Sequence, residues 1–188
     1  MKRNYHKLGS FEMTGSQMVV SDPCYDHDLW CCNAISDCLE GRWDAAVSYR
    51  KDEFGVRVAL MTAKHETVRS FSLCGNIRAD DQYVYYNSNW EVCSFGVGVD
   101  SGQAGLFDAA HYRDDHVFDN APEAEHDFDR VWYNHCCDCT LGKQQAGVIP
   151  FGVVSCSGYG DGCYTALQHK NAAGKVDCIV ILFLEDQE

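Results

Sequence analysis

Apolar and polar residues alternate along much of this chain. From 42 to 50, Trp43, Ala45, Val47 and Tyr49 share one side, and polar residues such as Asp44 and Ser48 lie between them. The same pattern resumes at 56–60, after a turn-like stretch at 51–55. A period of two favours β-strands, and two such runs joined by a short loop predict an antiparallel hairpin. Further strands are predicted at 17–21, 67–73, 82–86, 92–99, 146–156 (interrupted at Pro150) and 163–168.

The stretch 176–184 differs because it is apolar on both faces, which is typical of a central strand buried on both sides. Helical periodicity is scarcer. Cys31, Ile35, Cys38 and Leu39 form one stripe and predict a short helix over 28–39. A helical turn is predicted at 107–113. A longer helix is predicted to begin at Asn120, with Glu123 completing the N-terminal signal, and to end either near the run 136–139 or just before Gly142.

Strands follow one another through tight turns without regular βαβ alternation. We therefore expect a mainly β protein, with an α+β class left open. The expected architecture is an antiparallel β-sandwich or partly open barrel, with two or three short helices at the edge. The 188 residues are expected to form one domain, 1–188. Residues 1–16 carry little periodicity and are expected to be loosely ordered, and 185–188 to be a solvated tail.

The composition narrows the classes of partner. Asp and Glu (28) outnumber Lys and Arg (15), and a net charge of −13 would repel a phosphate backbone. We therefore expect no nucleic-acid partner. No run approaches the length of a membrane span, and no apolar signal segment follows the N-terminus, so we expect a cytoplasmic protein without a membrane partner. In that reducing compartment most of the 12 cysteines are expected to be small buried apolar residues.

Three loops each carry one aspartate among glycines or other turn-forming residues. They are 21–25 with Asp22, 99–105 with Asp100, and 155–164 with Asp161. We expect these loops to meet at one site and form a pocket for a polar, nucleotide-like small molecule. Glycine amides would hold anions, and Asp, Gln and Tyr would contact hydroxyls and rings. The expected ligand-binding residues are Asp22, Tyr25, Asp100, Ser101, Gln103, Ser157, Tyr159, Asp161 and Tyr164.

A divalent cation is the other candidate ligand. Asp22, Asp100 and Asp161, with the amide oxygen of Gln103, are oxygen donors that suit Ca²⁺ or Mg²⁺. The spacing matches no EF-hand loop. The alternative is that each Asp only caps its own turn.

Two further hypotheses concern catalysis and structure. A hydrolase would use Asp161 or Asp100 as general acid or base, or Cys24 as nucleophile with His27 three residues away. A neighbouring Asp22 disfavours the Cys24 thiolate that such chemistry needs. In the third hypothesis the protein is a structural or interaction protein with no ligand, and the glycine loops only close turns.

Two further features are candidate sites: a cysteine-rich run at 135–139 and a face of small residues in 92–99. His135 and Cys139, in the run 135–139, share a helix face and are candidate zinc ligands, but core packing is favoured over zinc. In 92–99, Ser94, Gly96 and Gly98 form one small-residue face, which lets another group approach closely. That group is either a ligand or a packed neighbouring element.

Five segments carry a further signal: 21–25, 41–43, 99–108, 132–133 and 152–164. Together they resemble a family of uncharacterised bacterial and phage proteins that is filed as a domain of unknown function. The resemblance runs from about residue 17 to the C-terminus and implies no established activity. Such proteins usually have Ser at the positions of Cys156 and Cys163, which implies that neither cysteine is an essential thiol.

Overall fold

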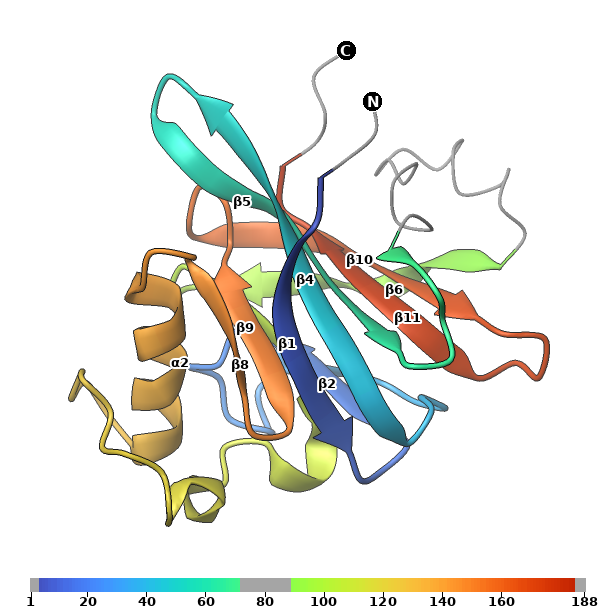
Figure 1. Cartoon of the computed structure of the whole chain (residues 1–188), viewed down its shortest axis with the longest axis horizontal. Coiled ribbons are helices and arrows are strands. Elements are labelled where there is room, and N and C mark those ends of the chain that lie inside the picture. The colour runs from blue at the N-terminus through green and yellow to red at the C-terminus, as the bar shows by residue number, and fades with distance from the viewer. Residues whose placement is uncertain (1–3, 72–88, 185–188) are drawn as a thin grey trace.

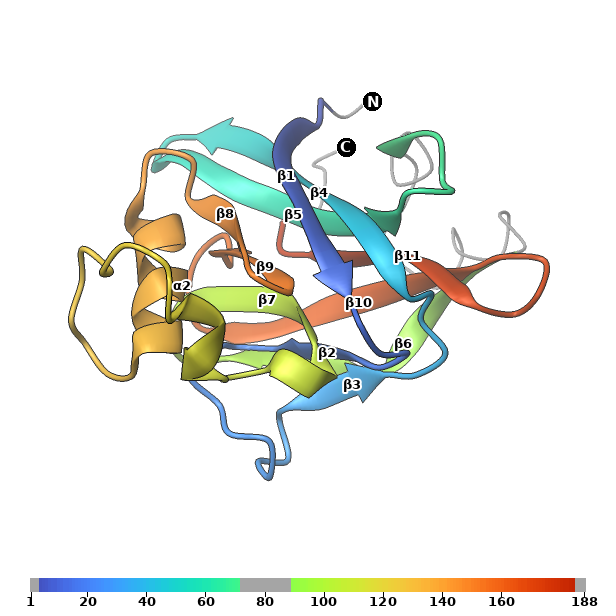
Figure 2. The ribbon, with the colours of Figure 1, turned by 60° about the horizontal axis from the view of Figure 1, so that its bottom comes forward.

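The computed structural model describes residues 4–71 and 89–184, which form two antiparallel sheets packed face to face (Figures 1 and 2). The sheets do not close into a barrel, so the chain is a mainly β sandwich, as predicted. The first sheet contains, in spatial order, β1 (His6–Met13), β4 (Gly41–Asp52), β5 (Gly55–His65), β11 (Val176–Leu182), β10 (Gly162–Lys170) and β6 (Trp90–Val99). The second contains β3 (Asn33–Ile35), β2 (Met18–Ser21), β7 (Gln103–Asp108), β9 (Gly152–Cys156) and β8 (Ala146–Ile149).

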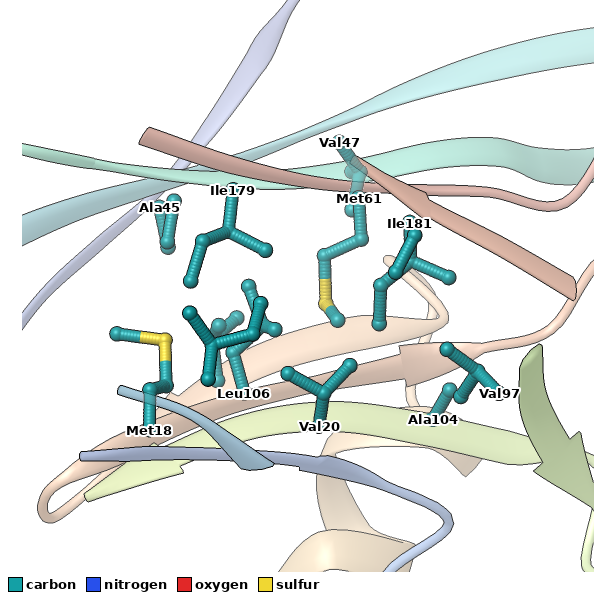
Figure 3. Packing of buried hydrophobic residues seen from close by; sticks show 14 of the residues in the cluster. Met18, Val20, Ala45, Val47, Met61, Val97, Ala104, Leu106, Ile179 and Ile181 are labelled. Carbon is teal, nitrogen blue, oxygen red and sulfur yellow. The ribbon is translucent and has the colours of Figure 1, made fainter. Parts of the chain in front are cut away.

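The main core fills the space between the two sheets. In Figure 3, Met61, Ile179 and Ile181 of the first sheet point toward Val20 and Leu106 of the second. Every residue of β11 is buried. Its side chains alternate between this core and a smaller cluster on the outer face of the first sheet, which includes Val180. The prediction of a central strand buried on both faces is therefore confirmed.

Helix α2 (Val131–Leu141) covers the outer face of the second sheet beside β8 and β9 (Figure 1). Trp132 on α2 packs edge-on against Phe107 of β7, with ring centroids 4.9 Å apart. Two 3-10 helices, η2 (Ala109–His111) and η3 (Asp115–Phe118), precede α2 and complete its apolar contact. No helix in the described ranges is long and apolar enough to cross a membrane.

The predicted helix start at Asn120 is wrong. The helix begins at Val131, and its preceding residue, Arg130, makes no side-chain capping bond. The cap comes instead from η3, because Asp115 accepts a hydrogen bond from the backbone N–H of Trp132 at 2.8 Å. Because the capping side chain lies 17 residues before the amide that it binds, the cap leaves no local signal in the sequence.

The helix predicted over 28–39 is also wrong. This stretch is made of turns around β3, whose residues pair with β2. The strand predicted at 67–73 does not form at 67–70, and its last residues, 72–73, lie outside the described residues. The strand predicted at 82–86 lies wholly outside them. The N-terminal stretch is more ordered than expected, since 6–13 forms β1 and pairs with β4. The tail 185–188 also lies outside the described residues.

The small-residue face of β6 is approached by the chain itself at Gly98 and Gly96, while Ser94 and Gly96 remain exposed. A Cβ added to Gly98 would lie 3.5 Å from the Cβ of Cys31 and 3.9 Å from the Tyr25 ring. A Cβ on Gly96 would lie 2.3 Å from the Cys163 sulfur. The close approach predicted for this face is therefore made by the loop after β2 and by β10.

Candidate functional site

Asp22 follows β2 directly and joins the first aspartate loop to the second. Its carboxylate is fully buried (0% exposed) and accepts four hydrogen bonds. One oxygen accepts from the Cys24 amide at 2.8 Å and from the Ser101 hydroxyl at 2.6 Å. The other accepts from the Asp100 amide at 2.9 Å and the Ser101 amide at 2.7 Å. Asp22 therefore caps its own turn and also holds a loop 78 residues further along the chain.

The second loop in turn contacts the third. The Ser157 amide donates to the Gly102 carbonyl at 3.0 Å. A Cβ on Gly102 would lie 4.0 Å from the Gly160 Cα, so the two backbones run close together. The three loops thus form one continuous edge, which we call the loop rim: residues 22–25, 100–103 and 157–161.

The three carboxylates do not form a metal centre. Within the described ranges no group of three or more His, Cys, Asp and Glu is placed to hold a metal ion. Both oxygens of Asp22 are already occupied by N–H and O–H donors. Asp161 is exposed and makes no hydrogen bond or ion pair with the described residues. The Ca²⁺ or Mg²⁺ assignment for these three residues therefore has no support in the geometry.

Asp100 and Tyr25 are neighbours in the rim, Asp100 exposed and Tyr25 buried. The Asp100 amide is bound to Asp22, but its carboxylate is exposed and interacts with the Tyr25 hydroxyl. Burial, reinforced by the hydrogen bond to Asp100, raises the pKa of Tyr25, so its phenol stays protonated. The backbone carbonyl of Tyr25 accepts from Tyr112, which fixes this loop from below.

Gln103 is buried, and its side chain binds α2. Its amide nitrogen donates to the Tyr133 hydroxyl at 3.3 Å and to the Cys137 sulfur at 3.5 Å. Its oxygen accepts from the Thr140 hydroxyl at 3.0 Å. Gln103 is predicted from the sequence to be a ligand contact, whereas in the structure its side chain connects the start of β7 to the helix.

Tyr133, Cys137 and Thr140 are the residues at this site that the sequence analysis missed. The Tyr133 hydroxyl also interacts with Ser101, and burial raises the pKa of Tyr133 to about 12. A usable signal was present, because the three residues occupy positions i, i+4 and i+7 of one helix and therefore share a face.

The third loop is held mainly by its own residues. The Ser157 and Tyr164 hydroxyls both donate to the Gly160 carbonyl, at 2.7 and 2.6 Å. Tyr159 points away from the other two loops, toward the tip of the β4–β5 hairpin, where its hydroxyl donates to Asp52. Of the predicted ligand residues, the structure thus brings Asp22, Tyr25, Asp100 and Ser101 into direct contact, and it separates the side chain of Tyr159 from them.

Cys24 is close to Asp22 and Ser101, yet its environment opposes nucleophilic chemistry. Burial first, and then the hydrogen bond and negative charge of Asp22, raise the pKa of Cys24 to about 12. The reactive form of a cysteine is the thiolate, so this thiol is a poor nucleophile at neutral pH. The hypothesis of Cys24 as a catalytic nucleophile has no support in this arrangement.

The candidate zinc cluster on α2 is used for packing. Cys136 is fully buried in the apolar cluster under the helix, and the His135 ring stacks on Phe118 at 3.9 Å. The Asp138 carboxylate accepts bonds from the Glu125 and His126 amides. All eleven cysteines in the described ranges are free thiols.

No curated protein and no solved structure matches this chain. A family model does match it, over residues 11–181, which includes all three loops of the rim and helix α2. The chain therefore belongs to the family described as "Protein of unknown function (DUF4241)".

Proposed function

We propose that this protein binds a small polar molecule at the loop rim, and that the bound part of the ligand is neutral or cationic. The observation that supports this most is the buried Asp22 carboxylate. It fixes the second loop through three bonds from Asp100 and Ser101. Loops on a rigid β scaffold commonly carry binding residues, and fixing them before a ligand arrives reduces the entropy lost on binding.

The groups held in place suit a ligand that has hydrogen-bond donors. Asp100 presents an exposed carboxylate, and the Ser101 and Tyr133 side chains lie half-buried beside it. The cation that contacts the first loop, Arg113, is already bound to the Pro23 carbonyl at 2.6 Å and to Asp26 at 3.1 Å. A free phosphate near Asp100 would meet a negative charge, so the nucleoside part of a nucleotide fits the rim better than its phosphate.

The free thiols support placing this function in a reducing, cytoplasmic environment. A hydrolase reaction with Asp100 or Asp161 as acid or base stays a prediction without a structural observation in its favour.

Calorimetry with a fixed panel tests the proposal: adenosine, cytidine, spermidine, arginine and AMP. Asp100→Asn removes the exposed charge and keeps the backbone amide that binds Asp22. Asp119→Asn is the matched control, because Asp119 is exposed and its ion pair is with His116, on η3. We expect at least one neutral or cationic probe to bind, Asp100→Asn to weaken it at least tenfold, and Asp119→Asn to change it less than twofold.

Adenosine should also bind more tightly than AMP if the rim contacts the nucleoside. Absence of binding across the panel by a folded protein would refute the proposal and favour a protein without a ligand. Equal affinity of wild type and Asp100→Asn would also refute it.

A further inference from the structure

One of the four tryptophans of this chain lies almost wholly in water. Trp30 is 92% exposed, whereas Trp43, Trp90 and Trp132 are between 0% and 4% exposed. Its neighbour Leu29 is 44% exposed. In Figure 2 the loop between β2 and β3, which carries both residues, projects away from the sandwich. Tryptophan is a largely buried residue on average, so a ring in this position is a candidate contact for another molecule.

The turn that carries Trp30 is held in place on both sides. Before the ring, the Leu29 amide donates to the Asp26 carbonyl at 3.1 Å, and the Asp26 carboxylate lies 3.1 Å from Arg113. After the ring, Cys31 is buried, with 7% of its surface exposed. The indole is therefore presented on a fixed support, which lowers the entropy lost when a partner binds it.

The charge presented to solvent beside Trp30 is negative. Asp28, two residues before the ring, is exposed and has no ion-pair partner in the described part of the chain. The Asp26 side chain is 73% exposed and shares its charge with Arg113. Arg113 itself is turned inward, since its side chain is 10% exposed and also donates to the Pro23 carbonyl. An exposed ring beside these carboxylates, in a chain of net charge −13, suits a cationic partner.

The surface beside the turn leaves room for an extended chain. Among the described strands, β3 and β6 are edge strands of their sheets. Cys31, directly after Trp30, lies against Gly98 of β6. On the same strand Gly96 and Ser94 are exposed. Small residues allow another backbone to come close, so a partner segment can lie along this side of the sandwich while one of its side chains reaches the indole.

We propose that Asp28, Leu29 and Trp30 form a docking surface for an extended, arginine-containing segment of a partner protein. Arginine matches both kinds of group, because its planar guanidinium stacks on an indole and its N–H donors pair with a carboxylate. Its aliphatic stem can cover Leu29. Lysine supplies the charge without the planar stacking surface.

Two synthetic peptides of equal charge test the proposal by calorimetry at constant ionic strength. One contains four Arg-Gly repeats and the other four Lys-Gly repeats, both with blocked ends. We expect the arginine peptide to bind saturably with a Kd below about 1 mM, and the lysine peptide to bind at least threefold more weakly.

Trp30→Ala should weaken binding of the arginine peptide at least fivefold, and Trp30→Phe should weaken it less, because it keeps a ring. Asp28→Asn should weaken it at least twofold. Phe54→Ala is the matched control, since Phe54 is an exposed aromatic residue (68%) in the turn between β4 and β5. Its effect should stay below twofold. All of these side chains are exposed, so circular dichroism should show that each variant folds.

A measurement on the wild-type protein reports the same contact without a substitution. Because the other three tryptophans are buried, acrylamide quenches mainly the fluorescence of Trp30. A saturating concentration of the arginine peptide should lower the quenching constant at least twofold. The proposal is overturned if the arginine peptide does not bind saturably or if the bound peptide leaves this quenching unchanged. Equal binding of both peptides that Trp30→Ala does not alter would also overturn it, because attraction by net charge alone would then suffice.

The docking surface does not depend on the function proposed for the rim, because it uses neither Asp22 nor Asp100. Asp100→Asn separates the two proposals: it should change the affinity for the arginine peptide less than threefold, whatever its effect on the small-molecule panel. If Asp100→Asn weakens the peptide as much as Trp30→Ala does, the peptide binds at the rim and the separate surface is refuted.

Discussion

Replacing Asp22 by Ala tests the central contact of the loop rim. The substitution removes the acceptor of four hydrogen bonds and leaves the amides of Asp100 and Ser101 without their partner. All four donors belong to half-buried or exposed residues (Cys24, Asp100 and Ser101), so some of them can regain water. We therefore count the cost of two of the four bonds to the carboxylate and take the other two to be replaced by bonds to water.

Each hydrogen bond to a charged group contributes about 1.5–3 kcal/mol. Two such bonds, with some relaxation of the loop, give an expected loss of about 3–5 kcal/mol in the free energy of unfolding for Asp22→Ala. Since domains are commonly stable by about 5–15 kcal/mol, this is a large fraction of the total. Asp22→Asn keeps the shape and one acceptor oxygen, but it turns an NH₂ group toward N–H donors, so we expect an intermediate loss.

Urea unfolding followed by circular dichroism measures these losses. With an m-value of about 2 kcal/mol/M, the midpoint for Asp22→Ala should fall by about 1.5–2.5 M. Asp161→Ala is the control, because Asp161 is exposed and makes no bond within the described structure. It should change stability by less than about 0.5 kcal/mol. A loss below about 1 kcal/mol for Asp22→Ala would show that Asp22 does not hold the two loops together.

Two other predictions concern single side chains. The Ser155 hydroxyl is fully buried (0% exposed) and has no hydrogen-bond partner among the described residues, so Ser155→Ala should raise the free energy of unfolding by about 0.5–1.5 kcal/mol. A clear loss of stability in the same urea assay would contradict this. With its pKa raised to about 12, Cys24 should be about 10⁻⁴ thiolate at pH 8, and its alkylation by iodoacetamide should keep accelerating up to pH 10. A rate that levels off near pH 9 in peptide mass spectrometry would show an ordinary thiol.

The strands that bury one or both faces in an apolar core could be predicted from the sequence. In β4, β5 and β6 alternate apolar positions face the space between the sheets, so period-two alternation identified each strand, whereas β11 was identified because it is apolar on both faces. In β1, by contrast, Phe11 and Met13 are the only buried residues, and the strand exists because its backbone pairs with β4. Pairing with a distant strand leaves little trace in side-chain pattern.

The two wrong helix predictions have a related cause. The apolar stripe at 28–39 has helical spacing, but its central residues complete an edge of the second sheet through β2. At Asn120 the capping signal is genuine in type, yet residues 121–130 are mostly exposed, and Phe128, at 63% exposed, does not pack on the sheet. Helix α2 begins where Trp132 reaches the cluster around Phe107 and where Asp115 supplies the cap. In both places tertiary contacts override local preference.

Sequence reasoning found the loops of the rim but could not separate the roles of their aspartates. Asp22 and Asp100 look alike in sequence, since each ends a strand within turn-forming residues. Their difference arises only when the loops meet, because the amides that Asp22 binds belong to Asp100 and Ser101. Once Asp22 is buried and saturated, Asp100 is the one whose carboxylate stays exposed beside Tyr25. The two residues therefore have different roles, because Asp22 fixes the position of the loop and Asp100 presents the charge. A change at Asp22 should alter the stability of the protein, and a change at Asp100 should alter ligand binding.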